Sequence, residues 1–264
     1  MLNSLTNVNI ELTSKCNKDC WMCGRRKIDK YYPNIAMEYG HMDFNLVKKL
    51  SKQLPPNITV QFHNNGESLL YPFFGKAVKL FPTQIKNIVT NGKLLVKKSD
   101  EIIDNLDTIS ISIIENDPEA DEQYEIIKEF LSIKQGRKPL VVFRLNGKVD
   151  PEKYIALNGL IATRVLHEPM GSFNYQKKNP TMPETGICWD FLNHLAINKD
   201  GYASICVRFD PLGSGIIGDC NKETLDEIWN GRTRMKWLEY HINGRRDKVP
   251  LCSYCDFYGV PTGV

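Results

Sequence analysis

Apolar residues in the first 167 positions of the chain form six short runs, separated by stretches with helical spacing. Each run is rich in Val, Ile or Phe and is bounded by Pro, Asn, Asp, Gly or Thr, which is typical of buried parallel strands. The runs are NVNIEL (7–12), NITVQFH (57–63), IKNIVT (85–90), TISISII (108–114), PLVVFRL (139–145) and ATRVLH (162–167).

Three segments between these runs carry apolar positions at helical spacing, residues 44–54, 93–106 and 118–136. The last one starts with Pro and acidic residues and ends at Gly136, as a capped helix does. Alternating strands and helices predict an α/β fold with a parallel sheet, open or curled into a partial TIM-like barrel. Ligand groups are then expected at the C-terminal ends of the strands.

The pattern changes after residue 167. Residues 168–186 are rich in Pro, Gly and Asn and predict a linker or an ordered loop. HLAIN and YASICV, joined by a turn at Gly201, predict a β-hairpin. Residues 222–231 and 233–244 predict two short amphipathic helices, each ending at Gly.

Composition is ordinary for a globular protein, with 42% hydrophobic and 25% charged residues among 264. No apolar run is long enough to span a bilayer and no secretory signal is visible, so we expect a cytoplasmic protein. A net charge of +3 without a basic block gives no indication of nucleic-acid binding. Eight cysteines are unusual in such a chain and point to metal or redox chemistry.

Three of these cysteines lie in TSKCNKDCWMCGR, directly after the first predicted strand: Cys16, Cys20 and Cys23. Structural zinc usually takes four closed ligands, whereas soft thiolates on one short loop suit a cubane iron–sulfur cluster. Three protein ligands leave one iron of such a cluster open to a small molecule. A zinc knuckle is the alternative that the spacing leaves open.

At these residues the chain resembles the radical S-adenosylmethionine (radical SAM) enzymes, whose hallmark is CxxxCxxC after the first strand. It departs from the family at Met22, where an aromatic residue is usual. The family also has a Gly-Gly-Glu stretch after the second strand, which binds the amino group of S-adenosylmethionine. Asn65, Gly66 and Glu67 of HNNGES stand in that place. Outside this context, such a string is usually only a turn.

Further cofactor contacts follow from the same resemblance. Thr90 and Asn91 belong to a TNG that follows the third strand, where the family often has one. Ser112 on the fourth strand, and Arg144 and Asn146 on the fifth, are candidates for the ribose and carboxylate of the cofactor. The alternatives are a plain turn, surface serines and a salt-bridged arginine.

A second set of cysteines lies near the C-terminus, Cys188, Cys206, Cys252 and Cys255. A hairpin pair and a CxxC suit either structural zinc or a cubane cluster. The spacing resembles the extension called SPASM in its shortened form, twitch, which holds one auxiliary [4Fe–4S] cluster. We therefore expect a radical SAM partial barrel over 1–167, a linker over 168–186 and a small α+β auxiliary-cluster domain over 187–264.

Two more residues are candidate catalytic groups. Cys220 is either a small buried hydrophobic residue, a hydrogen-atom donor as in peptide epimerases of the superfamily, or another cluster ligand. His63, at the end of the second strand, is either structural or accepts a proton from an oxidised substrate.

The resemblance implies that a reduced [4Fe–4S] cluster cleaves S-adenosylmethionine to a 5′-deoxyadenosyl radical, which takes a hydrogen atom from substrate. With an auxiliary cluster as second electron acceptor, we expect a two-electron dehydrogenation. Size and layout resemble a dehydrogenase of this superfamily that oxidises an aminocyclitol alcohol. The alternatives are a peptide maturase or epimerase and a non-catalytic zinc protein. Expected partners are a small-molecule or peptide substrate and an electron donor such as flavodoxin or ferredoxin, with no membrane and no nucleic acid.

Overall fold

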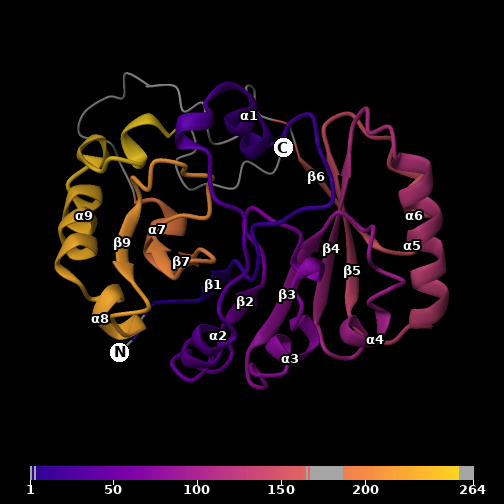
Figure 1. Cartoon of the computed structure of the whole chain (residues 1–264), viewed down its shortest axis with the longest axis horizontal. Helices are drawn as coiled ribbons and strands as arrows, with labels where there is room; N and C mark the ends of the chain where they lie inside the picture. The colour runs from indigo at the N-terminus through magenta and orange to yellow at the C-terminus, as the bar shows by residue number, and fades with distance from the viewer. Residues whose placement is uncertain (1, 3, 165, 167–186, 256–264) are drawn as a thin grey trace.

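The computed structural model describes residues 2, 4–164, 166 and 187–255. The predicted linker over 168–186 and the residues after 255 lie outside the described residues. Within the described ranges, nine strands form a single sheet in the order β6-β5-β4-β3-β2-β1-β7-β8-β9 (Figure 1). The predicted α/β class, with a largely parallel sheet, is therefore confirmed.

The first six strands run in sequence order across the sheet, and each pairs in parallel with its neighbour. All six coincide with predicted apolar runs, and the last run is described only in part. Their bounds are β1 (Asn7–Ile10), β2 (Thr59–Gln61), β3 (Ile85–Thr90), β4 (Thr108–Ile114), β5 (Leu140–Asn146) and β6 (Leu160–Arg164).

Helices and 3₁₀ turns connect these strands: α1 (Gly24–Tyr31), η1 (Pro33–Ile35), α2 (Phe44–Ser51), η2 (Ser68–Leu70), α3 (Phe74–Val78), α4 (Ser99–Ile102), α5 (Ala120–Lys134) and α6 (Glu152–Ile155). The long helix predicted over 93–106 was wrong. Backbone bonds there mix three- and four-residue spacing, so only the single turn α4 is regular. Helix α5 ends at Gln135, which takes the left-handed conformation (φ 48°) one residue before the expected Gly136.

The predicted hairpin is present as β7 (His194–Ile197) and β8 (Tyr202–Ser204), and Gly201 takes a positive φ of 91° at its turn. Strand β7 also pairs in parallel with β1, so the hairpin extends the first sheet. The sequence did not predict β9 (Ile216–Asp219), which adds the last antiparallel strand. The remaining elements are α7 (Trp189–Asn193), α8 (Leu225–Trp229), α9 (Arg232–Ile242), η4 (Arg246–Lys248) and η5 (Cys252–Tyr254).

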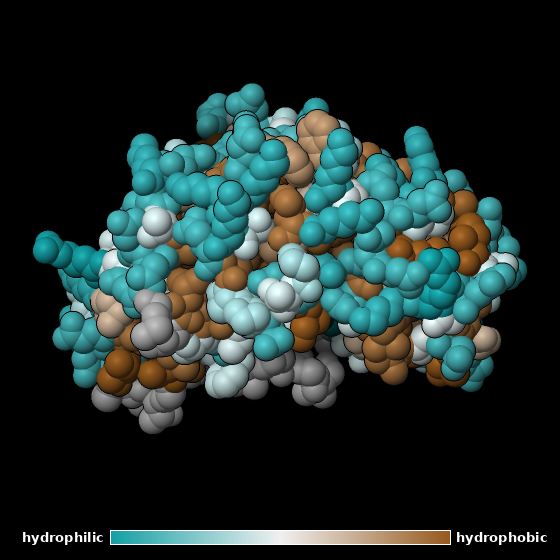
Figure 2. All heavy atoms as spheres, turned by 90° about the horizontal axis from the view of Figure 1, so that it is seen from below, coloured by the Kyte–Doolittle hydropathy of each residue, from teal (hydrophilic) through white to brown (hydrophobic). Residues whose placement is uncertain are grey.

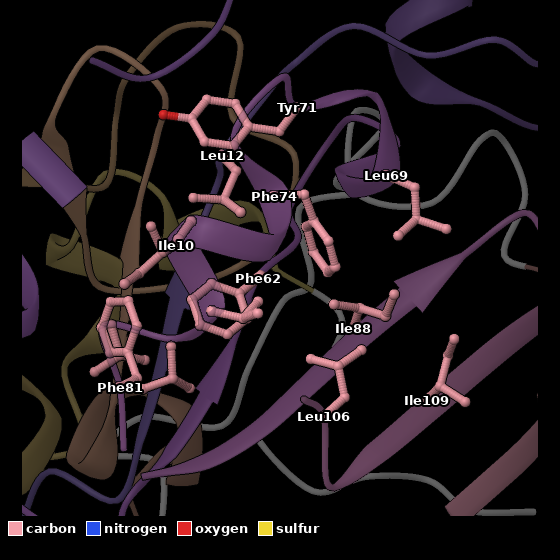
Figure 3. Packing of buried hydrophobic residues seen from close by; sticks show 14 of the residues in the cluster. Ile10, Leu12, Phe62, Leu69, Tyr71, Phe74, Phe81, Ile88, Leu106 and Ile109 are labelled. Atoms are coloured by element: carbon pink, nitrogen blue, oxygen red, sulfur yellow. The ribbon is translucent and has the colours of Figure 1, made fainter. Parts of the chain in front are cut away.

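The two faces of the sheet differ in chemistry because side chains alternate along each strand. One face carries the core, in which Ile10, Phe62, Ile88 and Ile109 are fully buried (Figure 3). The Phe62 and Phe81 rings meet edge to face at 5.0 Å. Each such side chain stabilises the fold by about 1.5–3 kcal/mol.

The opposite face carries polar residues at the same levels, among them Asn9, Gln61, Asn87, Ser110 and Arg144. The underside of the molecule in Figure 1 is mainly hydrophilic, with scattered hydrophobic patches (Figure 2). None of the helices in the described ranges has the length and apolar character that crossing a membrane requires.

Candidate functional site

The first cysteine loop leaves β1 at its C-terminal end and runs into α1, for which Cys23 is the N-cap. Cys16, Cys20 and Cys23 are all half-buried on this loop. Burial, together with the neighbouring Cys23 sulfur, raises the pKa of Cys20 to about 12. Burial also raises the pKa of Cys16. The free thiols of Cys16 and Cys20 are therefore protonated at neutral pH, so iron must displace their protons when it binds.

A buried ion pair fixes this loop to the segment that follows β4. The Lys18 ammonium lies 2.5 Å from Asp117 and 3.2 Å from Glu119, and the Lys18 and Asp117 side chains are each only 4% exposed. Lys93, which follows β3, reaches Glu119 at 2.5 Å. The loops after β1, β3 and β4 are thus tied together by charge, a connection that the sequence pattern did not reveal.

Asn91 connects the same loop to β3. Its side-chain amide donates to the Asn17 amide oxygen at 2.8 Å and lies 3.8 Å from the Cys16 sulfur. Gln123 of α5 donates to the Asn91 carbonyl at 2.7 Å and to the Ser112 carbonyl at 2.9 Å. Of the residues predicted after β3, Asn91 therefore lies against the cysteine loop.

The loop after β2 packs closely against the cysteine loop at Gly66. A Cβ atom at this position would lie 2.0 Å from the Thr13 carbonyl oxygen, so only glycine fits. This contact lets the Glu67 N–H donate to the Lys15 carbonyl at 2.8 Å. Arg25 of α1 donates to the carbonyls of both Ser14 and Asn65, which joins the two loops a second time.

Glu67 itself points inward and is 2% exposed. Its carboxylate accepts from the Thr90 hydroxyl at 2.9 Å, the Asn91 N–H at 2.8 Å and the Leu69 N–H at 3.2 Å. Burial outweighs these bonds and raises its pKa. A carboxylate has about four acceptor positions, so one remains for a further donor such as an ammonium group.

The polar face of the sheet places Ser112 of β4 directly beside Arg144 of β5. The Nε atom of Arg144 is buried without a hydrogen-bond partner among the described residues. Burial and the nearby Arg164 lower its pKa to about 10. Asn146 differs, because its side-chain amide donates to the carbonyls of Ile113 (3.1 Å) and Arg144 (2.8 Å). Its amide nitrogen is therefore already bonded within the sheet.

His63 lies at the end of β2, and its Nδ1 atom is likewise buried without a partner in the described part of the chain. Burial and the charges of Arg144, His194 and Arg164 lower its pKa to about 3. A general base works best when its pKa lies near the working pH. This environment is therefore unfavourable for the proton-accepting role predicted for His63.

The second set of cysteines lines one pocket. Cys188 is the N-cap of α7, Cys206 follows β8, and Cys252 and Cys255 begin and follow η5. Burial raises the pKa of Cys206 to about 12. Arg246 donates to the Cys252 carbonyl at 2.9 Å and the Cys255 carbonyl at 3.0 Å, and so holds the CxxC turn.

Among the described residues, no group of three or more His, Cys, Asp or Glu side chains is arranged to hold a single metal ion. Four thiols that line one pocket instead suit a larger inorganic group, such as a [4Fe–4S] cluster.

Cys220 is not near either set. It is 1% exposed and belongs to the hydrophobic core with Leu225, Ile228 and Trp229. Its carbonyl accepts from the Lys49 ammonium at 2.6 Å. The suggested roles of Cys220 as hydrogen-atom donor or cluster ligand are therefore corrected, because the thiol faces the core rather than a substrate or cluster site.

Comparison with known protein families bears on the second of the two cysteine sets. Residues 188–256 match the SPASM family, described as an iron-sulfur cluster-binding domain. This part of the chain is therefore similar to an iron–sulfur cluster-binding domain.

Several similar proteins align over nearly the whole length of this chain. The S-adenosyl-L-methionine-dependent 2-deoxy-scyllo-inosamine dehydrogenase of Niallia circulans is 24% identical over 97% of this chain and 94% of its own. The crystal structure of BtrN in complex with AdoMet and 2-DOIA has a TM-score of 0.65 at 18% identity, covering 98% of this chain and 96% of BtrN. Streptococcus suis SuiB bound to precursor peptide SuiA has a TM-score of 0.61 at 13% identity, covering 96% of this chain and 71% of SuiB.

Proposed function

We propose that this enzyme catalyses a two-electron dehydrogenation of an alcohol on a small molecule. The observation that carries the proposal is the four-cysteine cavity, because a second redox group gives the second electron of an oxidation a destination. The dehydrogenase relative, aligned over nearly the full length of both chains, supports the same reaction class.

In this proposal Cys16, Cys20 and Cys23 hold the cluster that binds S-adenosylmethionine, and Cys188, Cys206, Cys252 and Cys255 hold the auxiliary cluster. When bound, these groups supply a 5′-deoxyadenosyl radical that removes a hydrogen atom from substrate, and an acceptor for the second electron. Lys18 and Asn91 orient the first loop through Asp117 and Asn17.

The chain's own residues bind and orient the cofactor. The remaining acceptor position of Glu67 receives the ammonium of S-adenosylmethionine, and Gly66 brings that carboxylate next to the cysteine loop. Ser112 and Arg144 lie on the polar face of the sheet, where a hydroxyl and a guanidinium are available to the ribose and to a carboxylate. Thr90 acts indirectly, because its hydroxyl positions Glu67.

The epimerase alternative has less support in this chain, since Cys220 points into the core. A peptide substrate is the second candidate, favoured by the shared fold with SuiB bound to its precursor peptide. An electron donor such as flavodoxin or ferredoxin is the expected protein partner.

Anaerobically reconstituted variants test the proposal. Changing Cys16, Cys20 and Cys23 to Ala is expected to remove about half of the bound iron and all 5′-deoxyadenosine formation. Cys206→Ala is expected to keep 5′-deoxyadenosine formation but to abolish oxidation, measured as loss of two hydrogens from product. The first compound to test is 2-deoxy-scyllo-inosamine, the substrate named for the relative.

Cys220→Ala is the matched control, because this thiol contacts only the core and its loss should leave iron content unchanged. S-adenosylmethionine cleavage by the triple variant would disprove the assignment of the first cluster. A product of unchanged mass from the intact enzyme would disprove dehydrogenation.

A further inference from the structure

His241 is a buried polar residue in the pocket of the four C-terminal cysteines. It lies in the last turn of α9 and is 1% exposed. Its side chain lines the pocket together with Cys188, Cys206, Cys252 and Cys255. Both nitrogens of its ring are buried, and among the described residues neither has a hydrogen-bond partner. Since buried polar groups in proteins are nearly always hydrogen-bonded, this ring indicates a partner that enters the pocket.

Stacking holds the His241 ring in place. The ring lies on that of Phe191 in α7, with centroids 4.4 Å apart and planes inclined by 22°. The Arg234 guanidinium in turn lies 5.5 Å from the centroid of the Phe191 ring and 3.4 Å from that of the Trp229 ring. Arg234 also donates to the Phe191 carbonyl at 3.3 Å. The hydrogen bonds of an imidazole lie in the plane of its ring, so stacking on Phe191 leaves both nitrogens available.

The charges around the pocket suit a negatively charged group. Two arginines and one aspartate line it, Arg208, Arg246 and Asp190, so the pocket with protonated thiols carries net positive charge. Arg246 already donates to the carbonyls of Cys252 and Cys255. A [4Fe–4S] cluster held by four thiolates is negatively charged, and its sulfurs accept hydrogen bonds. His241 has an N–H for such an acceptor, because even a neutral imidazole carries one donor.

We propose that the His241 ring donates a hydrogen bond to a sulfur of the cluster held by the four C-terminal cysteines, and so raises the reduction potential of that cluster. This role rests on the proposed function, because it requires the auxiliary cluster. Reduction adds one electron, so the sulfurs become more negative and the hydrogen bond becomes stronger. The donor therefore favours the reduced form. A higher potential makes the cluster a better acceptor for the second electron of the proposed oxidation.

The midpoint potential of the auxiliary cluster is the first measurement. It is made by spectroelectrochemical titration of the full chain with Cys16, Cys20 and Cys23 changed to Ala, so that only the auxiliary cluster is reduced. His241→Phe keeps a flat ring against Phe191 but removes both nitrogens, and its cluster should be about tenfold harder to reduce. For a one-electron couple, this factor equals a potential lower by about 59 mV. His241→Gln returns an N–H donor and should recover part of the shift.

Pulsed electron paramagnetic resonance of the reduced cluster gives a direct signature of the contact. When the histidines are labelled with nitrogen-15, a nitrogen coupling to the cluster is expected, and His241→Phe should abolish it. His41→Phe is the matched control, because the His41 ring contacts Tyr71 edge to face at 5.9 Å and does not line the pocket. This control should leave both the potential and the coupling unchanged. Iron content and a thermal melt verify that each variant is folded and loaded.

Two results would overturn the role of His241: an unchanged potential in folded, iron-loaded His241→Phe, or no nitrogen coupling when His241 is present. A triple cysteine variant that binds no iron would reject the auxiliary cluster of the proposed function, and the role of His241 with it. If the potential shifts as expected but the unaltered enzyme oxidises no alcohol, the dehydrogenation is rejected and the hydrogen bond from His241 stands.

Discussion

The two cysteine sets of this protein are held in different ways. Cys16, Cys20 and Cys23 share one short loop, and that loop is fixed by polar contacts to the ends of β2, β3 and β4. The four C-terminal cysteines come from the start of α7, the end of β8 and the η5 turn, and line one pocket. The first site is local in sequence and depends on hydrogen bonds, whereas the second exists only when distant elements have packed.

The close approach at Gly66 gives the largest expected effect on the first site. Gly66→Ala forces a Cβ atom toward the Thr13 carbonyl and should separate the two loops. We expect a loss of about 3 kcal/mol in the free energy of unfolding and a melting temperature lowered by roughly 5–10 °C. Cleavage of S-adenosylmethionine should fall at least tenfold, while the auxiliary site retains its iron.

Gly136→Ala is the matched control, because Gly136 has a positive φ of 77° but no other atom would lie within 4 Å of a Cβ atom at this position. It should cost only about 1 kcal/mol and leave cleavage intact. Equal effects of both substitutions would show that close approach at Gly66 is unimportant.

The next largest effect on stability is expected from the buried ion pair between Lys18 and Asp117. Lys18→Met leaves the Asp117 carboxylate buried without its main counter-charge, and we expect a loss of about 2 kcal/mol in stability. Iron at the first site should be removed several times faster by a chelator, as followed by loss of its visible absorbance. Lys128→Met, which breaks the exposed pair with Glu125, should leave both the stability and the rate of iron loss nearly unchanged.

The smallest expected effect on stability comes from His241, which lines the pocket of the four C-terminal cysteines. Its ring stacks on Phe191 with centroids 4.4 Å apart, and burial with the charge of Arg246 lowers its pKa to about 4. The unfolded chain, with a pKa near 6.5, binds more protons in this range, so stability falls as pH falls from about 6.5 toward 4.

Between pH 7 and pH 5.5 this single histidine should therefore cost about 1 kcal/mol. In His241→Phe, chemical denaturation should show a pH dependence that is weaker by that amount. The same pH dependence in the variant and the unaltered protein would refute the prediction.

The sequence alone indicated the cysteines and the glycine of the first site, but not the charged residues that hold its loops together. The spacing of Cys16, Cys20 and Cys23 and the placement of Gly66 after the second strand are local patterns, and the fold brings them together as expected. Lys18, Asp117 and Arg25 act through partners between 11 and 99 residues away, so no local period marks them. Cys220 is the reverse case. Its residue type suggested a chemical role, but its neighbours in the structure are core side chains.

Strand β1 has a consequence for the order in which the protein folds. It hydrogen-bonds to β2 on one side and, 187 residues later in the chain, to β7 on the other, since Asn7 pairs with His194. At a synthesis rate of about 5–20 residues per second, one edge of β1 waits roughly ten to forty seconds for its partner on the ribosome. During that time the strand that leads into the first cysteine loop is an open edge, the kind of surface that chaperones cover and that aggregation exploits.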